Sequence, residues 1–183
     1  MRTVIGVIGK GTRGANDPVP QAAWDAAEAV GRLVAQRQGV MLTGGLGGVM
    51  EAASKGAQQA GGLVIGIIPG LDRREANPYC DVVIPSGIGT IRNHLTVRAS
   101  DAVIMIGGGS GTLNEVTICY GQKPLVVLEG SSGWADRLRS ALYEGKYVDE
   151  RRASEIHFAQ TPAQAVELAF RLAEMGLTTK TKG

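Results

Sequence analysis

The sequence predicts a single α/β domain of the Rossmann-like type, with a parallel sheet of about seven strands and helices on both faces. Short apolar runs without polar alternation recur along the chain, as expected for strands that are buried on both faces. Segments of helical period separate most of them, and this alternation is typical of βαβ units in a parallel sheet. We expect this domain to occupy residues 1–176 and a flexible tail to occupy residues 177–183.

Seven apolar runs mark the expected strands. Most of them contain several valines or isoleucines, which favour strands because branched side chains pack well on a pleated surface. In chain order the runs lie at residues 3–8, 40–43, 63–68, 81–84, 102–106, 125–128 and, with a weaker pattern, 156–159.

The segments between these runs repeat apolar residues every three or four positions, as helices with one buried face do. Expected helices lie at residues 23–34, 49–60, 91–99, 113–120, 134–142 and 162–175. The last of them has a complete start signal, because Thr161 can cap it, Pro162 stands in its first turn and Gln164 occupies the capping-box position. We expect Gly176 to end this helix.

The composition favours a small molecule as the partner. Lysine and arginine number 19 against 17 aspartates and glutamates, so the chain lacks the basic excess that nucleic acid or acidic membranes require. Cys80 and Cys119 have no metal-ligand spacing, and we expect two reduced thiols, no metal site and a cytoplasmic protein. No run approaches the roughly 20 apolar residues of a membrane span, and none reads as a secretory signal.

Glycine clusters follow four of the expected strands, at residues 9–14, 44–48, 87–90 and 107–112. Right-handed crossovers bring the loops that follow parallel strands to one edge of the sheet, which is where ligands bind. Peptide N–H groups in glycine turns, together with the positive end of the next helix, form a nest for an anion. The sequence therefore predicts a phosphate-binding edge.

Two familiar nucleotide motifs fit poorly. Residues 9–14 match GxGxxG, but two prolines delay the next helix, and the second strand ends in Thr43-Gly44 where a dinucleotide fold has an acidic residue. The GxxxxGK[ST] pattern of phosphate-binding loops in nucleotide-driven motors is absent. The polar segment at residues 70–79 lies near the expected ligand edge, as either a lid or an ordinary loop.

Two charged residues stand beside the glycine clusters. Arg92 follows Thr90, a plausible helix cap, and a cation in a first helical turn opposes the helix dipole by about 0.3–1 kcal/mol. An anionic ligand would remove that cost. Glu115 either closes a capping box with Thr112 or meets ligand hydroxyls or an N–H edge, and the two roles are compatible. His94 and His157 show no spacing that would make either a catalytic base, and no catalytic triad can be argued from the sequence.

The stretch GTIRNHLTVRASDAVIMIGGGSGTLNE, residues 89–115, resembles the family of LONELY GUY phosphoribohydrolases, also called lysine decarboxylase-like proteins. That family carries PGGxGTxxE after an Arg-Lys pair and a Ser-Asp-Ala stretch. Arg92 stands nine residues before Asp101, as in the family, and TGGLGGVMEAASKGA, residues 43–57, resembles the family pattern TGGxxGxMxAxxxGA. The resemblance covers about the first 130 residues and implies a Rossmann-like fold.

Two positions depart from the enzymes. Gly107 replaces their proline, and Asn93 replaces their lysine. This form is similar to the branch of molybdenum cofactor carrier proteins, which resemble the hydrolases in fold but bind a phosphate-bearing pterin cofactor. In the enzymes, the residues that match Arg92 and Glu115 are implicated in catalysis.

Three functions follow as hypotheses. The first is a homo-oligomeric carrier, a dimer or tetramer, that binds the molybdenum cofactor. The second is a phosphoribohydrolase that splits a nucleoside 5′-monophosphate, with Arg92 and Glu115 as its catalytic residues. The third is a nucleotide sensor without turnover. The candidate cofactor-binding residues are Gly9, Lys10, Gly11, Thr43, Gly44, Gly45, Gly47, Gly48, Arg92, Asn93, Gly107, Gly108, Gly109, Ser110, Gly111, Thr112 and Glu115.

Overall fold

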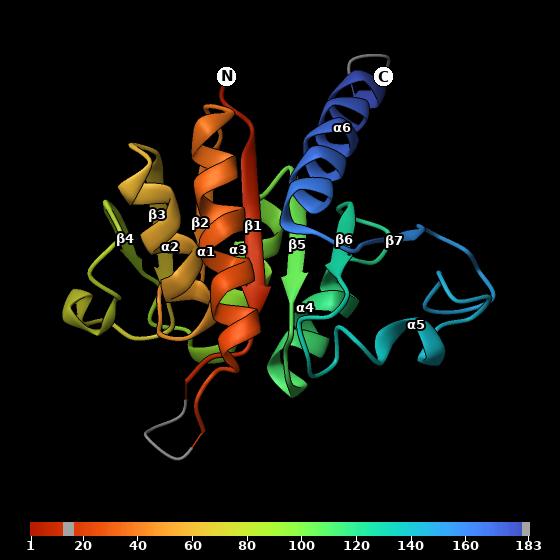
Figure 1. The fold of residues 1–183 in the computed structure, drawn as a ribbon, viewed down its shortest axis with the longest axis horizontal. Coiled ribbons are helices and arrows are strands. Elements are labelled where there is room, and N and C mark those ends of the chain that lie inside the picture. Colours follow the sequence, from red (N-terminus) through yellow and green to blue (C-terminus); the bar gives the residue numbers. More distant parts are fainter. Residues whose placement is uncertain (13–16, 181–183) are drawn as a thin grey trace.

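The strands form one seven-stranded, all-parallel sheet in the order β4-β3-β2-β1-β5-β6-β7 (Figure 1). The computed structural model describes residues 1–12 and 17–180, with side chains as far as residue 176. This architecture confirms the predicted fold class and every expected strand to within one residue at its ends. The strands are β1 Val4–Gly9, β2 Val40–Thr43, β3 Leu63–Ile68, β4 Val82–Pro85, β5 Ala102–Ile106, β6 Leu125–Leu128 and β7 Ile156–Ala159.

Helices cover both faces of the sheet, as predicted. The first face packs against α1, α2 and α6, and the second against α3, α4 and α5, so that two apolar cores enclose the central strands. Two short 3₁₀ helices, η1 Arg73–Glu75 and η2 Gly89–Arg92, lie between β3 and α3. The helices are α1 Gln21–Gln36, α2 Val49–Gln59, α3 Asn93–Ala99, α4 Ser110–Cys119, α5 Leu138–Ala141 and α6 Pro162–Lys180.

The segment expected as a helix at residues 134–142 is mostly a turn, and α5 covers only its second half. The backbone N–H groups of Trp134 and Ala135 donate to the carbonyls of Gly108 and Gly107 instead of continuing a helical ladder. Contacts with a distant loop therefore override the local helical pattern.

The last helix does not end at Gly176, as the sequence predicted, but continues to Lys180. A glycine that ends a helix adopts a positive φ, and Gly176 is not among the glycines that do so here. Residues 177–180, expected as part of a flexible tail, are helical, and residues 181–183 lie outside the described part of the chain. The predicted start is confirmed, because the hydroxyl of Thr161 accepts the Gln164 N–H at 3.2 Å.

Within the described residues, every helix is too short or too polar to cross a lipid bilayer.

Candidate binding site at the carboxyl edge of the sheet

A cavity of about 360 Å³ opens at the carboxyl edge of the sheet, within the usual size range of small-molecule sites. It lies where the chain order reverses between β1 and β5, which is the topological switch point of the sheet. Loops that follow β1, β2, β3, β4 and β5 all reach it, which confirms that the glycine-rich loops meet at one edge of the sheet. The cavity is lined by Ile8, Gly9, Lys10, Gly11, Thr12, Asp17, Leu46, Met50, Pro69, Thr90, Arg92, Asn93, Gly108, Gly109, Ser110, Gly111, Thr112 and Glu115.

The first turn of α4 forms one wall of the cavity. Gly109 is its N-cap, and the space beside Gly109 and Gly111 is open, because a Cβ added at either residue would have no atom within 4 Å. The first N–H groups of a helix have no partner within the helix, and the helix dipole adds partial positive charge there. This wall is therefore suited to an anion such as phosphate.

The glycine turn before α4 is held by a loop that sequence reasoning missed. The Ser131 hydroxyl accepts the Gly107 N–H at 2.8 Å and donates to the Leu128 carbonyl at 2.5 Å. Gly107 and Gly108 both have positive φ, of 62° and 110°, which glycine adopts without steric cost. Only the fold brings Ser131 to this turn, because the two segments follow neighbouring strands.

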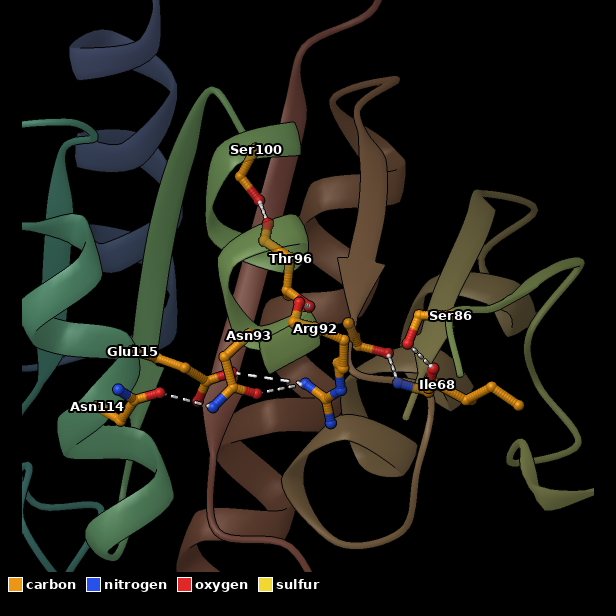
Figure 2. Close-up of polar contacts among 10 residues, drawn as sticks. Ile68, Ser86, Arg92, Asn93, Thr96, Ser100, Asn114 and Glu115 are labelled. Atoms are coloured by element: carbon orange, nitrogen blue, oxygen red, sulfur yellow. Dashed lines mark hydrogen bonds and ion pairs between the residues drawn. The ribbon is translucent and has the colours of Figure 1, made fainter. Parts of the chain in front are cut away.

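Arg92 projects from the end of η2 toward the cavity and is almost fully buried (Figure 2). Its Nη1 donates to Asn93 Oδ1 at 3.1 Å and lies 3.7 Å from Glu115 Oε1. Its Nε is buried and has no hydrogen-bond partner among the described residues. Burial lowers the pKa of the guanidinium, and the nearby Glu115 carboxylate opposes that shift. An orphaned buried donor costs about 1–3 kcal/mol, so a ligand oxygen that reached it would be bound favourably.

Glu115 lines the cavity from α4, opposite Arg92. Burial raises the pKa of its carboxyl to about 7, and the positive charge of Arg92 acts in the other direction. The side chains of Asn93 and Asn114 close the cluster, because Asn93 Nδ2 donates to Asn114 Oδ1 at 3.0 Å. Figure 2 shows this row of polar groups running from Arg92 to α4. A carboxyl group with such a pKa can accept an N–H or hydroxyl proton, or donate one, near neutral pH.

The structure corrects the predicted helix caps at both charged residues. The helix α4 begins at Ser110, three residues before its expected start, so Thr112 lies inside it and Glu115 closes no capping box. Thr90 is likewise no cap, because it lies within η2, which begins at Gly89. Glycine at the start of α4 concealed its true first turn, since glycine disfavours helices and usually marks a loop.

Lys10 and Asp17 form a charged pair on the wall of the cavity. Lys10 Nζ forms an ion pair with Asp17, and both residues line the cavity. Arg13 and Gly14, the end of the first predicted glycine cluster, lie outside the described residues. The sequence pointed to Lys10 through its glycine neighbours but gave no signal for Asp17.

Six of the predicted binding residues do not line the cavity. These are Thr43, Gly44, Gly45, Gly47, Gly48 and Gly107. Thr43 is buried, and its hydroxyl accepts the Gly45 N–H at 3.1 Å. A Cβ at Gly44 would collide with the Arg92 guanidinium, so this glycine makes room for that side chain. The turn after β2 thus positions Arg92, and direct binding by its glycines stays a prediction.

The loop at residues 70–79 is anchored away from the cavity. Asn77 is buried, its N–H donates to the Gly45 carbonyl at 2.8 Å, and its Nδ2 donates to the Leu46 carbonyl at 3.1 Å. None of the loop's residues lines the cavity. Of the two alternatives, these contacts favour an ordinary loop, which supports the turn after β2, and not a lid.

Seven lining residues were not among the sequence predictions: Ile8, Thr12, Asp17, Leu46, Met50, Pro69 and Thr90. Thr12, Leu46 and Thr90 lie within the glycine clusters and Ile8 adjoins one, so membership of those clusters was the available signal for these four. In the part of the chain that is described, no group of three or more histidine, cysteine, aspartate or glutamate side chains is arranged to hold a metal ion.

Comparison with known proteins agrees with this geometry. A model of the SLOG cluster4 family matches residues 2–166. The X-ray structure of the structural genomics target TM1055 is 36% identical in sequence to this chain and superposes on it with a TM-score of 0.85. The match covers 92% of this chain and 99% of the TM1055 chain. The molybdenum cofactor binding protein from the phototrophic bacterium Rippkaea orientalis is 32% identical, with 94% and 98% covered and a TM-score of 0.79.

The Moco carrier protein from Chlamydomonas reinhardtii is 29% identical, with 96% of this chain and 99% of that chain covered and a TM-score of 0.77. These likenesses agree with the carrier-like branch to which Asn93 and Gly107 pointed. The family match spans most of the chain and includes every described residue that lines the cavity. The chain belongs to the SLOG cluster4 family.

Proposed function

We propose that this protein binds the molybdenum cofactor and serves as a carrier or storage protein for it. The observation that carries the proposal is the open first turn of α4, which faces a cavity at the switch point of the sheet. Structures that are 32% and 29% identical over nearly their whole length, described as a molybdenum cofactor binding protein and a Moco carrier protein, support it.

The residues of the cavity suit a phosphate-bearing heterocycle. The N–H groups of Ser110, Gly111 and Thr112 offer donors for the phosphate, and the missing side chains at the glycines let it approach the backbone. Asn93 and Glu115 can pair with the N–H and carbonyl edges of a pterin. The Nε–H of Arg92, which has no partner among the described residues, can donate to one more acceptor on the ligand. In this proposal the chain holds the cofactor and performs no chemistry on it.

A second candidate is the phosphoribohydrolase activity on a nucleoside 5′-monophosphate. The observation in its favour is the buried pair of Arg92 and Glu115 beside the phosphate wall. In that reaction Glu115 would act on the ribose hydroxyls or position water while the glycosidic bond develops oxocarbenium character, and Arg92 would hold phosphate or polarise the ribose. The lysine expected beside the arginine in the enzymes is Asn93 here, so the site lacks one positive charge.

Retention of the cofactor tests the proposal. The protein is produced in a host that makes the molybdenum cofactor, and its molybdenum and oxidised, fluorescent pterin are measured after gel filtration. We expect both in stoichiometric amounts. Ser110→Asp, which places a negative charge at the phosphate wall, should abolish retention, whereas Ser140→Asp on the exposed face of α5 should not. Absence of both signals, or equal retention in Ser110→Asp, would refute cofactor binding.

Incubation with AMP and with N6-substituted AMP separates the second candidate from the first. Chromatography of the products detects the free base that hydrolysis releases. A pure carrier leaves both nucleotides intact. Release that disappears in Glu115→Gln would instead establish the hydrolase.

A further inference from the structure

Residues 129–137, which follow β6, form a loop that lies against the glycine turn before α4. The N–H groups of Trp134 and Ala135 donate to the two carbonyls of that turn. A Cβ at Gly133 would lie 2.5 Å from the Gly108 carbonyl oxygen, so the two backbones are in direct contact. None of the residues of this loop lines the cavity. The loop can therefore influence a ligand only through the turn.

Asp136 holds this loop in shape with both oxygens of its carboxylate. Its Oδ1 accepts the Gly130 N–H at 2.7 Å, and its Oδ2 accepts the Ser132 N–H at 3.0 Å. These two N–H groups stand on either side of Ser131, whose hydroxyl accepts the Gly107 N–H. Hydrogen bonds to a charged acceptor are stronger than those between neutral groups. One exposed side chain thus fixes the residue that binds the glycine turn.

The backbone of Ser132 shows that the loop needs such a restraint. Its φ is 73°, in the left-handed region, which strains a residue that carries a Cβ. A strained residue persists only where its surroundings hold it, and the Asp136 carboxylate accepts the N–H of this same residue. Without the carboxylate, the segment would reach other backbone conformations, and the position of the Ser131 hydroxyl would no longer be fixed.

An ion pair between α5 and the end of β6 closes the base of the loop. Arg139 Nε and Nη2 donate to the two carboxylate oxygens of Glu129 at 2.8 and 3.0 Å. The guanidinium also lies over the Phe158 ring, 3.9 Å from its centre. A bidentate pair of this kind fixes the geometry of both partners. The two ends of the loop are therefore anchored, and the remaining freedom lies in the part that Asp136 restrains.

We propose that Asp136 is a positioning residue for the anion-binding turn of the candidate site. Its carboxylate fixes Ser131, and Ser131 fixes the Gly107 N–H. The turn in turn sets the direction in which α4 presents its first N–H groups to the cavity. Donors that are in place before the ligand arrives bind it more tightly, because no ordering is needed on binding. This role rests on the proposed function, since the group that the turn would hold is the phosphate of that ligand.

Phosphate affinity and the exchange of the Gly107 amide proton test the role of Asp136. Asp136→Ala should weaken the binding of inorganic phosphate, measured by calorimetry, by about three- to tenfold. The Gly107 N–H should exchange with D₂O about tenfold faster in NMR spectra, because its acceptor is no longer fixed, while the N–H groups of β1 keep their rates. Asp136→Asn, which keeps one acceptor oxygen, should have smaller effects on both.

Two further variants separate positioning from a general loss of stability. Ser132→Gly in the Asp136→Ala background should restore much of the phosphate affinity, because glycine adopts the positive φ at this position without strain. Asp81→Ala is the matched control. Asp81 is also exposed and accepts a backbone N–H, that of Val64 at 2.8 Å, but it does so at the amino end of β3, across the sheet from the cavity. Phosphate affinity should not change in this control.

Circular dichroism checks that each variant is folded, as the exposure of Asp136 leads us to expect. The role of Asp136 is overturned if the Gly107 N–H of folded Asp136→Ala exchanges at the wild-type rate. It is equally overturned if that variant binds phosphate as tightly as the wild type, or if Asp81→Ala loses as much affinity. A wild type that binds no phosphate would refute the proposed function, whereas the Gly107 exchange rate would still decide whether Asp136 supports the turn.

Discussion

The guanidinium of Arg92 and the carboxylate of Glu115 lie 3.7 Å apart, although their side chains expose only 8% and 10% of their surface. Arg92 comes from the crossover after β4 and Glu115 from the helix after β5, so the pair joins two loops of the ligand edge. Burial disfavours the charged form of each, and a buried ion pair of this kind rarely adds stability. Its position on the wall of a cavity favours a role in binding.

Replacement of Glu115 by glutamine should change how stability depends on pH. The pKa of Glu115 rises from 4.5 to about 7 on folding, so between these values the folded protein holds a proton that the unfolded chain has lost. Stability therefore falls as the pH rises through this window, by an amount on the order of 3 kcal/mol. Glu115→Gln should remove this pH-dependent loss of stability. The unfolding free energy of Glu115→Gln, measured relative to that of wild type, should therefore be higher at pH 8 than at pH 4.5.

Urea denaturation at several pH values measures this effect. Glu167→Gln, on the exposed surface of α6, is the control and should follow the wild-type pH profile. The prediction is contradicted if the difference in unfolding free energy between wild type and Glu115→Gln is the same at pH 4.5 and at pH 8. Glu115 would then titrate normally.

The contact between Gly44 and Arg92 makes a second prediction. A Cβ at Gly44 would collide with the guanidinium, and the flexible arginine should yield by leaving its place beside Glu115. We expect Gly44→Ala to weaken phosphate binding severalfold while the fold survives, because Gly44 does not adopt a positive φ. In an Arg92→Ala background the same change should have no further effect, since the two residues act through one contact.

The phosphate-dependent rise in the unfolding midpoint reports this binding. Gly176→Ala is the control, because a Cβ there would meet no atom within 4 Å and its helix, α6, does not line the cavity. Equal effects of Gly44→Ala with and without Arg92 would show that the glycine does not act through the arginine.

The sheet was predictable because its strands are continuous apolar runs, and the ligand edge followed from the glycines at their carboxyl ends. The helix boundaries at the site were not predictable. Gly109, the N-cap of α4, and Gly111, in its first turn, carry the signal of a loop. Trp134 donates its N–H to a distant carbonyl and not to one in its own turn. Local propensity describes neither case, because a glycine-rich start resembles a loop at α4 and tertiary hydrogen bonds determine the backbone at Trp134.

The supporting residues of the site were hidden for a related reason. Ser131 and Asn77 hold the glycine turns through hydrogen bonds between segments far apart in sequence. A serine or asparagine in a polar loop has no pattern that distinguishes it from its neighbours. Arg92 and Glu115 were predicted because each stands next to a glycine cluster and matches a motif residue of the family that the sequence resembles, but their mutual contact required the fold.

The glycines of the α4 turn should separate into two kinds. Gly108 has a φ of 110°, and its Cβ would lie 2.7 Å from the Thr112 Cβ, so Gly108→Ala should destabilise the protein by about 1–3 kcal/mol. Gly111 is helical with open space around it, so Gly111→Ala should stabilise the ligand-free protein by about 0.5–1 kcal/mol. Urea denaturation measures both, and a destabilised Gly111→Ala would contradict the open first turn.

The ion pair between Lys10 and Asp17 makes the last prediction. Asp17 places a negative charge on the wall of a cavity suited to anions and pairs with Lys10. Asp17→Asn removes that charge and releases Lys10, so phosphate should bind about two- to fivefold more tightly, as expected for a partly exposed pair. Calorimetric titration with inorganic phosphate measures the change.

Because the ion pair is accessible to solvent, the gain in affinity should shrink as the ionic strength rises from about 20 to 200 mM. Asp25→Asn, on the exposed face of α1, should leave the affinity unchanged. If Asp17→Asn binds phosphate no better than the wild type at low salt, Asp17 does not compete with the ligand for Lys10.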